Sequence, residues 1–132
     1  MILVDTSVLI DLFRGVENEP VELFRDIARK KLPFGITSVI YQEILQGAKS
    51  EKEYISLQEY LSTQRFFHPI DPILSYAGAA NIFFSCRRKG ITIRSTIDCL
   101  IAQITIEHEL YLLHNDKDFT AMASAIGLKI YH

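Results

Sequence analysis

The N-terminal segment contains the feature that most constrains the fold. Residues 2–12 read ILVDTSVLIDL, in which three apolar residues lead into Asp5 and a second apolar run follows Thr6 and Ser7. This pattern predicts a short buried strand that ends on a carboxylate, then a helix entered through Thr6 and Ser7 and covering residues 8–13. Strands of open parallel sheets place ligand-binding groups just beyond their carboxyl ends. Asp5 is therefore expected at the functional edge of such a sheet.

Further short apolar runs predict the rest of the sheet. They lie at residues 34–36, 66–70, 111–113 and 128–131 and do not alternate with polar residues, which is typical of strands covered on both faces. Caps, breakers and apolar spacing predict helices at about 21–31, 38–46, 50–61, 73–89, 95–109 and 119–126. The fold class is therefore predicted to be α/β, a sandwich around a central, mainly parallel sheet of four or five short strands. We find no linker or internal repeat, so residues 1–132 are expected to form a single domain.

The composition narrows the class of protein. No apolar run approaches the ~20 residues needed to span a bilayer, and the N-terminus lacks the features of a signal peptide. The cysteines Cys86 and Cys99 have no metal-site spacing, which predicts free, buried thiols in a cytoplasmic protein. A net charge of −2 argues against binding nucleic acid by charge alone but does not exclude a nuclease. The basic residues cluster at 29–31 and at 87–94, where they either face phosphate or are solvated helix ends.

Acidic residues recur at comparable places in the predicted fold. Asp5 and Asp116 follow strands, Asp98 lies in the first turn of a helix, and Glu43 borders the apolar face of another helix. Asp118 lies two residues beyond Asp116. Each aspartate has a structural alternative, because Asp5, Asp116 and Asp118 could cap helices and Asp98 could complete a capping box with Ser95. Glu43 is harder to explain structurally, since a buried carboxylate is costly unless it is paired or binds a cation.

A cluster of carboxylates without a compensating base implies a bound cation. Several acids cannot all be ionised close together unless positive charge intervenes. An oxygen-only ligand set favours Mg²⁺ or Mn²⁺, and Mg²⁺ typically binds one or two carboxylates together with substrate phosphate. This chemistry points to hydrolysis of phosphate esters, with Ser7 as a hydroxyl that either supports a ligand or caps the helix. His114 is interpreted as a structural residue, and Asp11 lies too far along the helix to join the cluster.

Four segments together resemble the PIN-domain family, and within it the VapC toxins of bacterial and archaeal toxin–antitoxin pairs. The segments are MILVDTSVLIDL, TSVIYQEILQGA, GITIRSTIDCLIA and LYLLHNDKDFTAMASAIGLKIY, and the resemblance extends in order over essentially the whole chain. The resemblance implies a PIN-like α/β/α sandwich and metal-dependent endoribonuclease activity on structured RNA such as tRNA or rRNA. It also implies a homodimer inhibited by a cognate VapB-like antitoxin. The family's acidic set falls on Asp5, Glu43, Asp98 and Asp116, with Ser7 and Thr6 in support, and Asp118 matches an acid that only some members use.

Two other functions remain compatible with these residues. A non-catalytic PIN-like module would bind RNA or act as a scaffold, and retention of all four acids counts against it. A metal-dependent phosphatase would hydrolyse small phosphoesters and leave RNA untouched. Metal titration separates the first alternative from the nuclease, and the choice of substrate separates the second.

Overall fold

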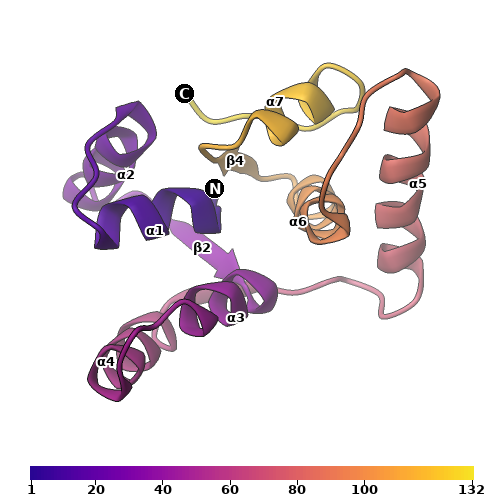
Figure 1. The fold of residues 1–132 in the computed structure, drawn as a ribbon. Helices are drawn as coiled ribbons and strands as arrows, with labels where there is room; N and C mark the ends of the chain where they lie inside the picture. The colour runs from indigo at the N-terminus through magenta and orange to yellow at the C-terminus, as the bar shows by residue number, and fades with distance from the viewer.

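Four short parallel strands form the centre of the molecule. A computed structural model describes residues 1–132 (Figure 1), and the four strands are paired in the order β3-β2-β1-β4. Their bounds are β1 Ile2–Val4, β2 Phe34–Thr37, β3 Arg65–Phe67 and β4 Tyr111–Leu113. All three strand pairs are parallel, so the carboxyl ends of the four strands lie at one edge of the sheet. The predicted α/β sandwich around a parallel sheet is confirmed, with four strands.

Seven helices flank the sheet. They are α1 Thr6–Phe13, α2 Glu19–Arg29, α3 Ser38–Gln46, α4 Glu51–Leu61, α5 Leu74–Arg88, α6 Thr96–Glu107 and α7 Lys117–Ala123. The side chains of Asn18, Thr37 and Ser50 accept hydrogen bonds from the first turns of α2, α3 and α4, which explains where those helices begin. None of the seven has the length and hydropathy required to cross a membrane.

The predicted fifth strand, residues 128–131, is reduced to one bridge between Leu112 and Ile130. The reason is the alternation of backbone groups along β4. The N–H of Tyr111 and the carbonyl of Leu113 point toward the β1 side, so only Leu112 offers both groups to the outer side. Those two groups pair with Lys129 and Tyr131, each at 2.9 Å. The segment therefore closes the outer side of β4 without extending the sheet.

The strands that lead to the sheet edge are part of the apolar core. Leu3, Val4, Ile36, Leu112 and Leu113 are at most 1% exposed and belong to one continuous apolar cluster. Packing at this density leaves side chains and strands little freedom to shift. The groups that follow β1, β2 and β4 are therefore held in fixed positions relative to one another.

Gly35 is required for the close approach of β2 to β3. A Cβ at this position would lie 2.6 Å from the Phe67 ring and 2.7 Å from the Arg65 carbonyl oxygen. Helices α5 and α6 also pack closely, because a Cβ at Gly78 of α5 would lie 2.6 Å from the side chain of Gln103 on α6. The α5–α6 pair forms one end of the molecule (Figure 1).

Candidate active site

Asp5 ends β1 and caps α1. Its Oδ2 accepts hydrogen bonds from the backbone N–H of Ser7 at 3.1 Å and from the Ser7 hydroxyl at 2.6 Å. The helix begins two residues before the start expected at residue 8, so Thr6 and Ser7 both lie inside α1. Asp5 occupies the cap position, which was the structural alternative for this residue. Asp5 is 5% exposed. Burial raises the pKa of Asp5 to about 6; the Ser7 hydrogen bonds oppose this shift and repulsion from Glu43 adds to it.

Thr6 connects Asp5's helix to Glu43. The Thr6 hydroxyl donates a hydrogen bond to Oε1 of Glu43 at 3.0 Å, which joins α1 to α3. Glu43 is half-buried, and no lysine or arginine forms an ion pair with it. The bond turns the Glu43 carboxylate toward the edge of the sheet where Asp5 lies.

Asp98 occupies the first turn of α6 without serving as a cap. Ser95 stands at the N-cap position but makes no side-chain hydrogen bond, so the capping box that the sequence allowed is absent. Burial raises the pKa of Asp98 to about 7, with further increases from repulsion by Asp5, Asp116 and Glu43. That repulsion agrees with a position of Asp98 near the other three carboxylates.

Asp116 combines a structural contact with its place near the other acids. Its Oδ1 accepts the Asp118 backbone N–H at 2.9 Å, which caps α7. The Asp116 backbone N–H in turn donates to Nδ1 of His114 at 3.0 Å. Burial lowers the pKa of His114, and its ring packs against Phe119 at 5.3 Å between centroids. His114 therefore holds the turn in place as a neutral acceptor, in line with the structural role expected for it.

Asp118 differs from Asp5, Glu43 and Asp98 because its carboxylate is paired with a cation, Arg94. It is 6% exposed, and its Oδ2 accepts hydrogen bonds from Nε of Arg94 at 3.2 Å and from the Arg94 backbone N–H at 3.3 Å. Nη2 of Arg94 lies 3.5 Å from Oδ1 of Asp118 and 3.9 Å from Oδ1 of Asp116. Asp118 does not cap α7. The sequence placed Arg94 in a basic cluster but offered no reason to pair it with Asp118.

Asn115 and Asp11 support the loop after β4, and neither was predicted from the sequence to belong to the site. The backbone N–H of Asn115 donates to the Ser7 hydroxyl at 2.9 Å, and its Nδ2 donates to Oδ2 of Asp11 at 3.0 Å. Because Asp11 lies on α1, its hydrogen bond with Asn115 anchors this loop to that helix. Asp11 also accepts a hydrogen bond from Asn18. Asp11 lies outside the acidic cluster, as expected. Only the HND motif beside Asp116 could have drawn attention to Asn115.

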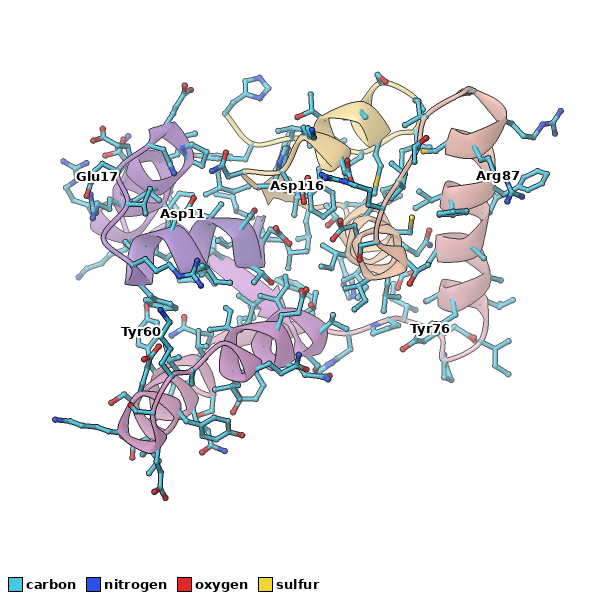
Figure 2. The ribbon with its side chains drawn as sticks, in the orientation of Figure 1. Asp11, Glu17, Tyr60, Tyr76, Arg87 and Asp116 are labelled. Carbon is cyan, nitrogen blue, oxygen red and sulfur yellow. The ribbon has the colours of Figure 1, made fainter.

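The donor set at this edge suits a hard divalent cation. Asp5, Glu43, Asp98 and Asp116 supply carboxylate oxygens from β1, α3, α6 and α7, and Figure 2 shows Asp116 in the space between α1 and α7. Burial is the main cause of the raised pKa values of Asp5 and Asp98, and repulsion from neighbouring acids adds to it. No three of the side chains are yet close enough together to hold an ion. Holding an ion between three of them would require the carboxylates to lie closer together.

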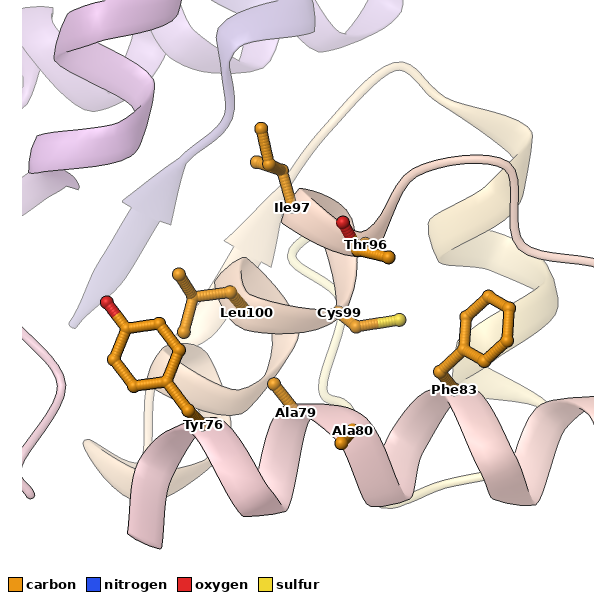
Figure 3. Close-up of a pocket in the computed structure, with 8 residues that line it drawn as sticks. All are labelled: Tyr76, Ala79, Ala80, Phe83, Thr96, Ile97, Cys99 and Leu100. Atoms are coloured by element: carbon orange, nitrogen blue, oxygen red, sulfur yellow. The ribbon is translucent and has the colours of Figure 1, made fainter. Parts of the chain in front are cut away.

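Cys99 lies next to Asp98 in the sequence but projects away from the carboxylates. Figure 3 shows its side chain in an apolar groove between α5 and α6 that Tyr76, Phe83 and Leu100 also line. Cys86 and Cys99 are both free and buried, as expected, and burial raises the pKa of Cys99 to about 11. Neither thiol is therefore a candidate nucleophile.

Comparison with known proteins places this fold and site in a family. A family model described as the PIN domain matches residues 2–125. The chain is 32% identical over 130 residues to VapC ribonuclease Mb1587 of Mycobacterium bovis, covering 98% of this chain and 96% of that protein. Ribonuclease VapC11 of Mycobacterium tuberculosis matches with the same identity and coverage.

Solved structures with lower identity share the fold. DNA-bound VapBC from Salmonella typhimurium superposes with a TM-score of 0.76 at 18% identity, covering 98% of this chain and 96% of that chain. VapBC2 from Rickettsia felis, bound to a DNA fragment from its promoter, gives a TM-score of 0.74 at 19% identity, covering 99% and 98%. The family-model match, the sequence relatives and the parallel sheet agree: the chain belongs to the PIN-domain family and, within it, to the VapC type.

Proposed function

We propose that this protein is the toxin of a type II toxin–antitoxin system, an endoribonuclease that hydrolyses RNA phosphodiester bonds with Mg²⁺ or Mn²⁺. The observation that supports the proposal is the repulsion of Asp98 by Asp5, Glu43 and Asp116. Neither Asp98 nor Asp5 nor Glu43 forms an ion pair with a lysine or arginine. Relatives at 32% identity are named VapC ribonucleases, which supports RNA as the substrate class.

The four carboxylates would hold the ion, and the surrounding residues would orient them. A bound Mg²⁺ or Mn²⁺ lowers the pKa of a coordinated water and offsets negative charge on the phosphate. The Ser7 hydroxyl fixes the Asp5 carboxylate, and the Thr6 hydroxyl fixes that of Glu43. Because these bonds occupy one oxygen of each carboxylate, the other oxygen remains available to a ligand. Burial of Asp5 strengthens its interaction with a cation, since the local dielectric is lower than in water.

The partners follow from the family and from exposed apolar surface. Solved VapBC complexes superpose on this chain, and we propose a VapB-like antitoxin as its inhibitor. We also propose a homodimer, for which the apolar surface around the start of α5 is the candidate contact. The apolar side chains there are strongly exposed: 76% for Ile73, 70% for Leu74 and 53% for Tyr76. Grouped exposed apolar side chains of this kind mark protein–protein contacts. Light scattering of the wild type and of Leu74→Asp tests the dimer; a monomeric wild type contradicts it.

Brief induction of the chain in a bacterial host, followed by sequencing of RNA ends, tests the function and identifies the RNA. New ends at defined sites in tRNA or rRNA and arrest of growth are expected within minutes of induction. Asp98→Asn should produce neither, whereas Glu59→Gln, which removes one exposed carboxylate on α4, should behave as the wild type. Growth arrest without new RNA ends would favour the non-catalytic RNA-binding module, and intact RNA with phosphoester turnover would favour the phosphatase.

A further inference from the structure

Asp118 is the acid at this edge whose known contacts leave least room for a metal ion. Its two oxygens face Arg94, which approaches with its backbone N–H, Nε and Nη2. Asp118 is 6% exposed, so water satisfies little of the remaining hydrogen-bonding capacity of its carboxylate. In contrast, Asp5 and Asp98 have no cationic partner, and burial raises their pKa values. Asp118 thus has a different task from the four acids of the proposed metal site.

Arg94 is held by one edge of its guanidinium group. Nε and Nη2 point to the same side, and this side is bound to Asp118. No protein group accepts a hydrogen bond from Nη1, and the side chain is 63% exposed. The end of the guanidinium, formed by Nη1 and the outer hydrogen of Nη2, is therefore open to solvent beside Asp116. A planar fork with two donors matches two oxygens of a phosphate.

Charge balance supports a phosphate as the occupant of this open end. Arg94 is the only lysine or arginine that forms an ion pair with any of the five acids at the edge. A phosphodiester approaching the carboxylates requires positive charge from the protein as well as from the ion. Since Asp118 already restricts the guanidinium, binding a phosphate there loses less side-chain entropy than binding to a free arginine.

We propose that Arg94 binds the non-bridging oxygens of a backbone phosphate of the RNA, and that Asp118 is a positioning residue that holds Arg94 for this contact. The inference rests on the proposed function, because the phosphate belongs to the RNA substrate. Asp118 also binds the backbone N–H of Arg94, four residues before Asp98, and so holds the loop that leads into α6. The contact adds affinity for RNA independently of which RNA is cleaved.

The test measures RNA binding separately from cleavage. Bulk transfer RNA labelled with fluorescein is titrated in Mg²⁺ at several salt concentrations, with fluorescence anisotropy as the readout. All variants carry Asp5→Asn, so the RNA remains intact. Arg94→Gln keeps a donor near Asp118 but removes the charge and the fork. The matched control is Arg65→Gln, since Arg65 begins β3 and therefore lies at the opposite edge of the sheet.

The expected result is specific to a phosphate contact. Arg94→Gln should weaken binding about tenfold at low salt and reduce the slope of log affinity against log salt by about 0.7–0.9, the value for one phosphate. Arg65→Gln should leave the slope unchanged. Arg94→Lys should restore the slope but not the full affinity, because an ammonium lacks the fork. An unchanged slope in Arg94→Gln would overturn the contact.

Asp118→Asn tests the positioning role. It should weaken RNA binding nearly as much as Arg94→Gln, and the double variant should lose no more than Arg94→Gln alone. Binding equal to that of the Asp5→Asn parent would overturn the role of Asp118. Urea unfolding verifies that each variant is folded, and if Asp118→Asn unfolds, the comparison of Arg94→Gln with Arg94→Lys still decides the proposal.

Failure of this inference differs from failure of the proposed function. If the wild type cleaves RNA in Mn²⁺ and Arg94→Gln binds RNA as its parent does, only the role of Arg94 is wrong. If the wild type neither binds nor cleaves RNA, the proposed function is wrong and the inference is overturned with it.

Discussion

The hydroxyl of Ser7 joins Asp5 to Asn115, which lies 108 positions after Ser7 in the chain. It donates to Oδ2 of Asp5 at 2.6 Å and accepts the backbone N–H of Asn115 at 2.9 Å. Asn115 directly precedes Asp116, so a single hydroxyl sets the separation of two proposed metal ligands. Ser7 therefore contributes both to the stability of the fold and to the geometry of the site.

Replacing Ser7 with alanine should destabilise the protein. Ser7→Ala leaves the Asn115 N–H without its acceptor and removes one donor from Asp5, so the free energy of unfolding should fall by about 1–2 kcal/mol. Urea denaturation in EDTA measures this change. Ser56→Ala, an exposed position in α4 without a side-chain hydrogen bond, is the control and should change little. Equal effects of the two substitutions would show that the Ser7 bonds are unimportant.

The raised pKa of Asp5 predicts how stability without metal depends on pH. The folded state raises this pKa from 3.8 to about 6, so the fold favours the protonated acid. Stability from Asp5 is therefore fully present below its unfolded pKa and is lost as pH rises through about 6. Asp5→Asn should unfold like the wild type near pH 4 in EDTA. At about pH 8 it should be more stable by about 2 kcal/mol, allowing for relaxation of the site. Urea titrations at both pH values test the difference.

Added Mn²⁺ should make the wild type more stable than Asp5→Asn, the reverse of their order in EDTA at about pH 8. A ligand that binds only the folded state stabilises it, by about 2.7 kcal/mol at one hundred times its dissociation constant. The wild type should gain melting temperature with added Mn²⁺, and Asp5→Asn should gain much less. Glu59→Gln should gain as much as the wild type. A Mn²⁺ response that is the same in Asp5→Asn as in the wild type would exclude Asp5 as a ligand.

Replacing Gly35 with alanine should weaken the packing of β2 against β3, and Gly127 provides a control position. Gly35→Ala places a Cβ against the Phe67 ring and the Arg65 carbonyl, and the backbone oxygen cannot move without disturbing β3. The free energy of unfolding should fall by about 2–3 kcal/mol. Gly127→Ala, whose Cβ would meet nothing within 4 Å, should be within about 0.5 kcal/mol of the wild type. Similar stabilities of the two variants would show that β2 and β3 can separate at low cost.

The strand–acid pattern of ILVDTSVLIDL predicted β1 and the position of Asp5 at the strand end, and the further apolar runs without polar alternation predicted the parallel sheet. Local patterns of this kind depend on burial and capping, which act within a few residues. The sequence could not predict that Ser7 bonds Asn115 or that Asp118 binds Arg94, since these pairs form only after distant segments pack. The predicted fifth strand is not formed for a similar reason, because only Leu112 of β4 presents its backbone groups to the segment at residues 128–131.

The carboxylates illustrate the same limit within the site. Their residue types and their places after strands predicted a cluster, and the mutual repulsion that raises the pKa of Asp98 agrees with it. Asp5 and Asp116 each cap a helix as well, so the structural and functional interpretations of these residues are not exclusive. Asp98 makes no cap, which leaves its carboxylate available for chemistry.

The most direct test of the central claim is RNA cleavage by the purified protein as Mn²⁺ is titrated from an EDTA-treated start. Cleavage of bulk RNA should be absent in EDTA and rise with Mn²⁺ for the wild type and for Glu59→Gln. Asp98→Asn should lose about a hundred- to a thousandfold in rate while remaining folded, the scale of removing an electrostatic stabiliser of a reacting charge. Cleavage in EDTA at the wild-type rate, or by folded Asp98→Asn in Mn²⁺, would contradict the four-carboxylate site.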